Sequence, residues 1–170
     1  MKLFLAAFVM MATVAFTACS EKDNDPKESY EASTTFDILH NGQAVAAGAT
    51  VEHTLTAEEI RNDDAEVSLY VKNKSNATVQ RVFKVEFVEG PEMMRTEAPI
   101  CYGVCEAREC PYTSGAVTLE AGATDDMPII IHVYPGLLEA PDAHTGTYKI
   151  TVGKGASLED PQVCFLKFNW

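Results

Sequence analysis

The sequence predicts an all-β domain, an antiparallel β-sandwich of eight or nine short strands with at most one short helix. Three observations support this prediction. Apolar residues recur at every second position in several short segments. Glycine, proline and asparagine turn signals separate these segments at intervals typical of a sandwich. After residue 20, no long segment has the period of a helix. A closed barrel is the alternative architecture for the same pattern.

The first half of the domain begins with a predicted strand over residues 34–39. Asn41-Gly42 is a strong signal for a turn after this strand. Thr56, followed three residues later by Glu59, forms a capping box, which predicts one or two helical turns at 56–60. The strands predicted in this half are 34–39, 50–55, 66–71 and 83–87, with a return segment of small residues at 43–49.

The second half contains one irregular segment and one strongly apolar segment. Residues 91–114 have no clear period and hold three of the five cysteines. Residues 127–134 are apolar on both faces, which predicts a central strand that is covered on both sides. The strands predicted in this half are 116–119, 127–134, 148–152 and 163–170, with a proline-containing loop at 137–144. The whole pattern favours a sandwich of immunoglobulin-like type.

Residues 1–18 have the pattern of a secretory signal peptide. Lys2 precedes an unbroken apolar run, and small residues follow that run at the cleavage position. The segment 16–19 resembles the lipobox of bacterial lipoproteins. This resemblance implies cleavage before Cys19 and acylation of Cys19, including a palmitate-type chain. An ordinary signal peptide is the alternative.

The expected domain organisation has three parts: a signal peptide at 1–18, a flexible acidic tether at 19–33 and a β-sandwich at 34–170. The tether is rich in charged residues and has no apolar face, so it cannot offset the entropy of ordering. Its acidic run resembles surface-export signals in some lipoproteins of Bacteroidetes-type bacteria; a plain linker is the alternative. We expect a cell-envelope protein anchored by lipid to the outer membrane, either periplasmic or surface-exposed.

The net charge of the chain limits the classes of partner that it can bind. Removal of residues 1–18 takes away one lysine and no acid, which leaves 12 Lys and Arg against 25 Asp and Glu, a net charge of −13. A surface this acidic repels phosphate groups, which excludes nucleic acid as a natural partner. It equally disfavours anionic lipid head groups. Membrane contact is therefore expected through the lipid anchor alone.

The chain from about residue 66 onward resembles a known class of domain. Its motifs, in their order, resemble immunoglobulin-like domains of exported proteins and lipoproteins of Bacteroidetes-type bacteria. The resemblance implies fold and export, and it implies no defined activity. The motifs are Val71-Lys72-Asn73-Lys74-Ser75, Gly90-Pro91, Ile100-Cys101, Cys110-Pro111-Tyr112, Leu119-Glu120-Ala121-Gly122, His132-Val133-Tyr134-Pro135 and Gly146-Thr147-Tyr148.

Four cysteines remain after Cys19, and their number in an exported chain predicts two disulfides with three pairings open. The resembled domains often carry two cysteines, which align with Cys101 and Cys110. The resemblance therefore implies Cys101–Cys110 and, for the two additional cysteines, Cys105–Cys164. The rival set is Cys101–Cys105 with Cys110–Cys164. A zinc site made from the same four thiols is the alternative to disulfides.

The residues indicate binding rather than catalysis. No serine lies in a nucleophile-elbow pattern, and no cysteine is paired in sequence with an obvious catalytic histidine. We expect no enzyme activity, no cofactor and no metal. Apolar residues in two loops are the candidate contact patch for a protein or glycan ligand; capping of the sandwich core is the alternative role. These residues, with one adjoining arginine, are Met93, Met94, Arg95, Leu137 and Leu138.

Two functional classes follow from this interpretation. The first is a non-catalytic binding or adhesion module displayed on the outer membrane. The second is a structural or assembly subunit of an envelope complex that pairs through an exposed edge strand.

Cys19→Ser is expected to move the protein from the membrane fraction to the soluble fraction, because each buried acyl methylene contributes about 0.8 kcal/mol to membrane binding. Fractionation followed by immunoblotting checks this, with Ser20→Ala as the control. Unchanged membrane retention of the Cys19 variant would contradict the anchor.

Overall fold

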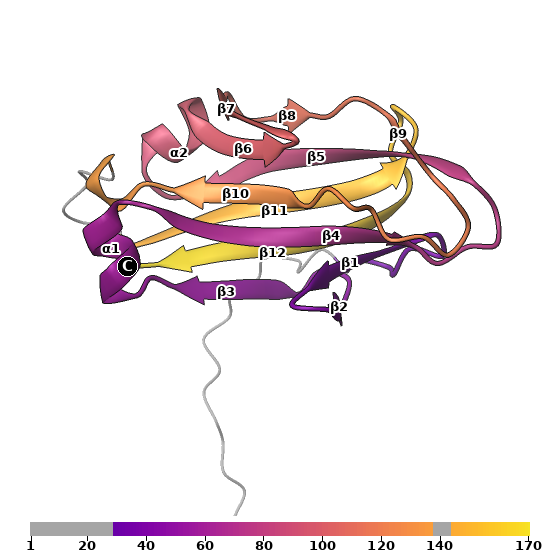
Figure 1. Cartoon of the computed structure of the whole chain (residues 1–170), viewed down its shortest axis with the longest axis horizontal. Helices are drawn as coiled ribbons and strands as arrows, with labels where there is room; N and C mark the ends of the chain where they lie inside the picture. Colours follow the sequence, from indigo (N-terminus) through magenta and orange to yellow (C-terminus); the bar gives the residue numbers. More distant parts are fainter. Residues whose placement is uncertain (1–28, 138–143) are drawn as a thin grey trace, which may run out of the picture.

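A computed structural model describes residues 29–137 and 144–170. The signal peptide, Cys19, most of the expected tether and Leu138 lie outside the described residues. The described strands form two sheets packed face to face (Figure 1), so the structure confirms an all-β immunoglobulin-like sandwich. In Figure 1, β10 and β4 of the first sheet cross in front of β11 and β12 of the second.

The first sheet, sheet I, has six antiparallel strands in the order β2-β1-β4-β10-β6-β7. The turn predicted at Asn41-Gly42 joins β1 to β2, and both residues have positive φ. The strand bounds are β1 Phe36–His40, β2 Gln43–Val45, β4 Ala65–Asn73, β6 Ala98–Tyr102, β7 Val104–Arg108 and β10 Ile129–Val133.

The second sheet, sheet II, has the order β3-β12-β11-β5-β8, and β9 pairs with another part of β5. The pairing of β3 with β12 is parallel, unlike the other pairings between described strands. The strand bounds are β3 Thr50–Thr54, β5 Val79–Glu89, β8 Tyr112–Thr113, β9 Val117–Leu119, β11 Thr145–Lys154 and β12 Glu159–Asn169.

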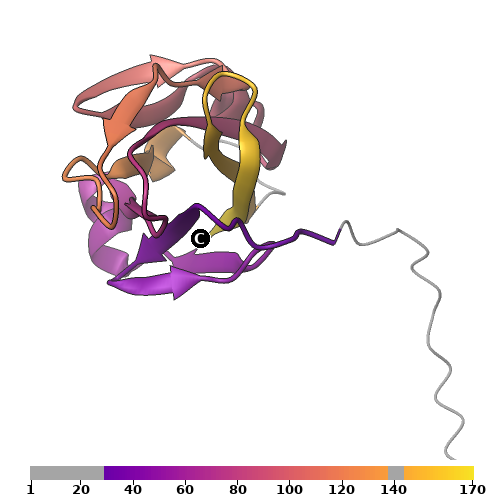
Figure 2. The same cartoon turned by 90° about the vertical axis from the view of Figure 1, so that its right-hand side faces the viewer.

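The core lies between the two sheets and is built from the alternating residues of the long strands. Figure 2, which looks nearly along the strands, shows how the layers enclose it. Val67, Leu69 and Val71 face inward from β4, while Leu166 and Phe168 face them from β12; all five are buried. Cys164, Leu166 and Phe168 alternate along β12 on the face that packs into the core, and Trp170 packs against the same core. Ile130 is half-buried on the outer face of β10, which has neighbours on both sides in sheet I.

The helical segments are short. The capping box is confirmed: the Thr56 hydroxyl accepts from the Glu59 backbone N–H, and the Glu59 carboxylate accepts from the Thr56 N–H, at the start of α1 (Ala57–Asn62). A second helix, α2 (Glu92–Thr96), and a single 3-10 turn, η1 (Pro135–Leu137), were not expected. Both follow a strand directly at a proline, Pro91 and Pro135, which cannot donate to a sheet ladder.

The segment 91–114 is more regular than its sequence suggested. It contains α2, the hairpin of β6 and β7, and the two-residue strand β8. Cys110 and Pro111 join through a cis peptide bond just before β8. The hairpin turns at Gly103, whose φ of 72° suits a residue without a side chain. The extra short strands raise the total to twelve described strands, against the eight or nine expected.

Residues that precede position 34, within the expected tether, already contact the sandwich. The Tyr30 ring packs edge-on against Phe165 with 5.7 Å between centroids. Ser33 is buried, and its backbone N–H donates to the Gln162 side chain. Asp160 accepts hydrogen bonds from Thr34 and Thr35. Desolvation opposes ionisation of this carboxyl, yet these hydrogen bonds prevail and lower the pKa of Asp160 to about 2.

A buried ion pair joins the two sheets. Arg81 on β5 is fully buried, and its Nε lies 3.0 Å from Oδ2 of Asp125, a buried carboxylate in the connection from β9 to β10. The Tyr102 hydroxyl donates to the same oxygen at 3.0 Å, and its ring centroid lies 4.4 Å from the Arg81 guanidinium carbon. The Met127 backbone N–H donates to the other carboxylate oxygen. Burial, opposed by the charge of Arg81, raises the pKa of Tyr102 to about 12.

Asp125→Asn or Arg81→Met is expected to lower the free energy of unfolding by about 3–5 kcal/mol, because each change leaves one buried charge without its partner. Urea titration followed by circular dichroism measures this. The matched control is Lys84→Met, which breaks the half-exposed pair between Lys84 and Glu86 and is expected to cost about 1 kcal/mol or less. Equal effects of the buried and exposed changes would contradict the assignment.

Candidate functional site

A gap between two neighbouring strands of sheet I creates the candidate site. β6 pairs with β10 at only two positions, Cys101 with Ile130 and Ile100 with Ile131. β10 then continues through His132 and Val133 alongside β4, while the chain before β6 belongs to α2. A cavity of about 240 Å³ opens where the two strands part.

The cavity leads from the outer face of sheet I into the core. Its mouth includes Cys105 and Ala107 on β7 and Tyr134 just after β10. Its floor includes Met94 and Tyr148, both buried. Met93, Pro99 and Val133 also line the cavity, so the wall is mainly apolar, and Glu97, Glu106 and His132 supply the charged or titratable groups. A site of this composition fits an apolar group with a polar or basic neighbour.

The floor is held by one hydrogen bond and one close contact. The Tyr148 hydroxyl donates to the Met94 carbonyl oxygen at 2.7 Å, and burial raises the pKa of Tyr148 above its ordinary value. A Cβ at Gly146 would overlap the Met94 side chain, so the small residue at 146 leaves room for Met94. The depth of the cavity is therefore fixed by α2 and β11 together.

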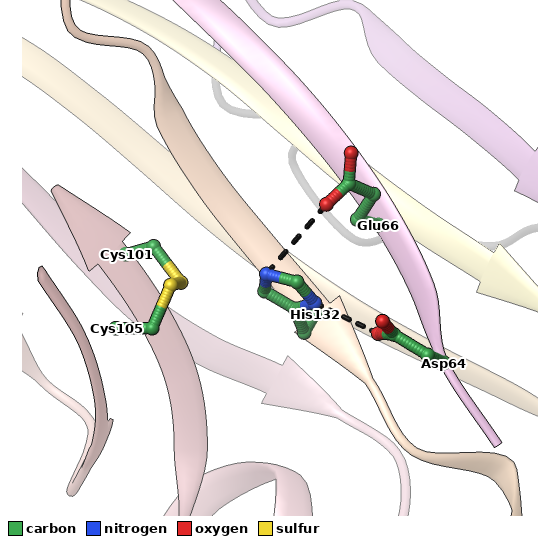
Figure 3. Close-up of a disulfide and its surroundings, with 5 residues drawn as sticks. All are labelled: Asp64, Glu66, Cys101, Cys105 and His132. Atoms are coloured by element: carbon green, nitrogen blue, oxygen red, sulfur yellow. Dashed lines mark hydrogen bonds and ion pairs between the residues drawn. A yellow bond between two sulfur atoms is a disulfide. The ribbon is translucent and has the colours of Figure 1, made fainter. Parts of the chain in front are cut away.

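His132 lies between two carboxylates and a disulfide (Figure 3). Its Nδ1 is 2.8 Å from Oδ1 of Asp64, and its Nε2 is 3.7 Å from Oε2 of Glu66. Because a carboxylate only accepts, Nδ1 carries the proton that it donates to Asp64. The His132 ring stacks on Tyr134 with 6.1 Å between centroids. These contacts fix the ring at the edge of the cavity.

β7 is an open edge of sheet I beside the cavity. Its first four residues are exposed, and among the described strands it pairs with β6 alone. The Cα atoms of Cys101 and Cys105 are 3.9 Å apart, which is the close spacing of a pair that exchanges no backbone hydrogen bonds. The N–H and C=O of Cys105, and of Ala107 two residues later, therefore point away from β6. Among the described residues, no other segment bonds to these groups.

The predicted binding residues are brought together only in part. Met93 and Met94 line the cavity, as rim and floor. Arg95 lies outside the lining, and its guanidinium pairs with Glu92 and lies 3.8 Å from Glu109. Leu137 ends η1, and Leu138 lies outside the described residues. Sequence reasoning missed His132, Tyr134 and Tyr148 because they belong to strands or strand ends, whereas the predicted patch consists of loop residues.

The disulfide prediction implied by the resemblance is wrong. The four cysteines in the described part of the chain form one disulfide, Cys101–Cys105, while Cys110 and Cys164 are free and buried. The hairpin register places Cys101 directly opposite Cys105. Cys110 follows β7 and contacts the core, where its N–H donates to the Arg95 carbonyl. In the rival set, the Cys101–Cys105 pair is thus correct and the Cys110–Cys164 pair is wrong.

Similarity to a solved structure supports the fold. The N-terminal domain of PorA has a TM-score of 0.56 at 16% identity, over 79% of this chain and 96% of that one. The periplasmic chaperone SfaE has a TM-score of 0.42 at 9% identity, over 79% and 56% of the two chains. A family 123 glycoside hydrolase from Clostridium perfringens has a TM-score of 0.38 at 11% identity, over 71% and 23%.

No protein-family model matches the sequence. No curated protein matches it either. Among the described residues, no helix is long and apolar enough to cross a membrane. The likeness to solved structures shows the fold alone.

Peptide mapping without reduction is expected to recover a Cys101–Cys105 disulfide and two free thiols. Burial raises the pKa of Cys110 to about 11 and that of Cys164 to about 12, so both thiols should resist alkylation at pH 8 until the protein is denatured. Mass spectrometry after iodoacetamide treatment, with and without urea, measures this. A Cys110–Cys164 disulfide, or fast alkylation of the native protein, would contradict the structure.

Proposed function

We propose that this chain is a non-catalytic binding module of the cell envelope that takes an extended segment of a partner protein along β7. An apolar side chain of that segment occupies the neighbouring cavity. The observation that carries this proposal is the position of an apolar cavity beside an open strand edge, with Cys105 and Ala107 belonging to both. Recognition by strand addition needs these two features together: backbone hydrogen bonds for affinity and side-chain pockets for specificity.

The edge is suited to strand addition. The outward N–H and C=O groups of Cys105 and Ala107 provide a ladder of donors and acceptors, and the Cys101–Cys105 disulfide holds β7 against β6. Ala107 is small, so a side chain beside it reaches the cavity mouth unobstructed. A strand already fixed in position loses little further conformational entropy when it binds.

The charges around the cavity favour a basic partner segment. Glu97 and Glu106 line the cavity, and Asp64 and Glu66 flank His132 at its edge. Arg108 pairs with Glu106 at 2.5 Å, but Glu97 has no ion pair among the described residues. The partner chemistry that fits is an extended peptide with an apolar anchor next to a lysine or arginine.

The proposal also includes a location for the module at the outer membrane. An acyl chain on Cys19 and the acidic tether would hold the sandwich at the outer membrane, as the sequence of residues 1–33 predicts. The second functional class, an assembly subunit, is favoured by the same open edge of β7. It differs in its partner, which would be a permanent neighbouring subunit rather than an exchangeable segment.

Peptides selected from a random library against the mature protein are expected to carry an apolar residue beside a basic one and to bind through β7. Ala107→Pro removes an N–H that faces away from β6, so it should weaken binding at least about tenfold while the fold is retained. Calorimetric titration measures the affinity, and thermal unfolding checks the fold.

Ala44→Pro is the matched control, because Ala44 occupies an equivalent place on β2, at the opposite edge of sheet I. Gln43 and His40 flank the two-residue turn and form its hydrogen-bonded pair, so the Ala44 N–H also faces outward. Its binding should equal that of the unaltered protein. If the peptides bind the Ala107→Pro variant with the same affinity as the unaltered protein, strand addition is refuted. Binding to a glycan array without binding to peptides would favour a glycan ligand.

A further inference from the structure

Two sulfurs and an imidazole meet at the edge of the cavity. The Sγ atoms of Cys101 and Cys105 and a ring nitrogen of His132 all lie within 4.8 Å of one another. The three residues come from β6, β7 and β10, and Figure 3 shows the histidine ring between the disulfide and Asp64. Thiolate and imidazole are the ligands that zinc and similar divalent ions prefer.

The histidine is already oriented as a metal ligand would be. Its Nδ1–H donates to Asp64 at 2.8 Å, which leaves the lone pair of Nε2 available for a cation. A carboxylate on the far nitrogen is the arrangement that supports most metal-bound histidines. Asp64 would therefore be a positioning residue for the site.

Glu66 offers a fourth ligand on the His132 side, although it is not among the three residues whose ligand atoms all lie within 4.8 Å of one another. Oε2 of Glu66 is 3.7 Å from Nε2 of His132. Ligand atoms around a tetrahedral zinc ion, at bond lengths of about 2.0–2.3 Å, lie about 3.3–3.8 Å apart. The nitrogen and oxygen are thus already near the spacing that a shared ion requires. The C-x3-C spacing of the two cysteines also falls within the range of zinc sites.

We propose that reduction of the Cys101–Cys105 disulfide converts this cluster into a site for a divalent zinc-type cation, held by Cys101, Cys105, His132 and Glu66. A dithiol supplies two electrons and two protons, becomes a disulfide itself, and leaves two cysteine thiols. The cation then displaces both thiol protons and binds two thiolates, the neutral imidazole and one carboxylate. The oxidised hairpin has no thiolates to offer, so disulfide and cation exclude each other.

Access to the sulfurs is compatible with this conversion. Cys105 is exposed, so a dithiol reaches its sulfur from solvent, while Cys101 is 3% exposed. Cys110 and Cys164, the other two cysteines of the earlier zinc alternative, are absent from the cluster. The proposed cation site does not depend on strand addition to β7, and the two proposals are tested separately.

Cobalt titration tests the proposal. The protein is the full chain carrying Cys19→Ser, which is reduced with a dithiol; the dithiol is then removed under anaerobic conditions before Co²⁺ is added. One equivalent of Co²⁺ should bind with the absorption bands of tetrahedral thiolate coordination, and Zn²⁺ should displace it. The oxidised protein should bind at least 100-fold more weakly. No thiolate bands in the reduced protein, or equal binding by the oxidised protein, would overturn the proposal.

Variants separate this site from other thiols and histidines. Cys105→Ser and His132→Gln should each weaken binding at least 100-fold, and Asp64→Asn by about 10–100-fold. His53→Gln is the matched control, because His53 also pairs with a carboxylate, Glu59, at 2.8 Å. Cys110→Ala controls for the buried thiols, and both controls should bind as the parent does. Equal loss in His53→Gln, or loss only in Cys110→Ala, would overturn the assignment.

Discussion

The buried carboxylate of Asp125 is the constraint on which the arrangement of sheet I depends. It accepts hydrogen bonds from Arg81 of sheet II, from Tyr102 of β6 and from the backbone N–H of Met127, two residues before β10. A charge buried this deeply is tolerated only with such partners, so their positions are fixed together. β6 and β10 are consequently held together near the Tyr102 end of β6. Their separation at the other end makes the cavity.

The same two-strand geometry explains why one small region has several chemical properties. Where β6 leaves β10, the ladder stops, core side chains such as Met94 and Tyr148 become reachable, and the outer-face residue His132 lies at the rim. The Cys101–Cys105 hairpin then forms the far wall. An apolar pocket, an open strand edge and a set of metal-ligating atoms therefore occur side by side because one sheet is incompletely paired.

The sequence predicted the parts of the fold that local patterns encode. Alternation located the long strands, Asn41-Gly42 located a hairpin, and Thr56 with Glu59 located α1. The β6–β7 hairpin was missed because Pro99 and the cysteines obscure its period. Cys101–Cys105 was ranked below the pairing implied by resemblance, since the choice depends on cross-strand register. Of the predicted patch, Met93 and Met94 line the cavity, and His132 and Tyr148 join them there only through three-dimensional contacts.

The parallel pairing of β3 with β12 has a consequence for how the domain forms. β12 follows all the other strands in the sequence, yet it lies inside sheet II between β3 and β11. Sheet II therefore closes only when residues separated by more than a hundred positions in the chain have met, and such distant contacts form slowly. A chain whose last residues have not yet joined the fold lacks an interior strand of sheet II, so β3 and β11 have no partner between them until the C-terminal segment arrives.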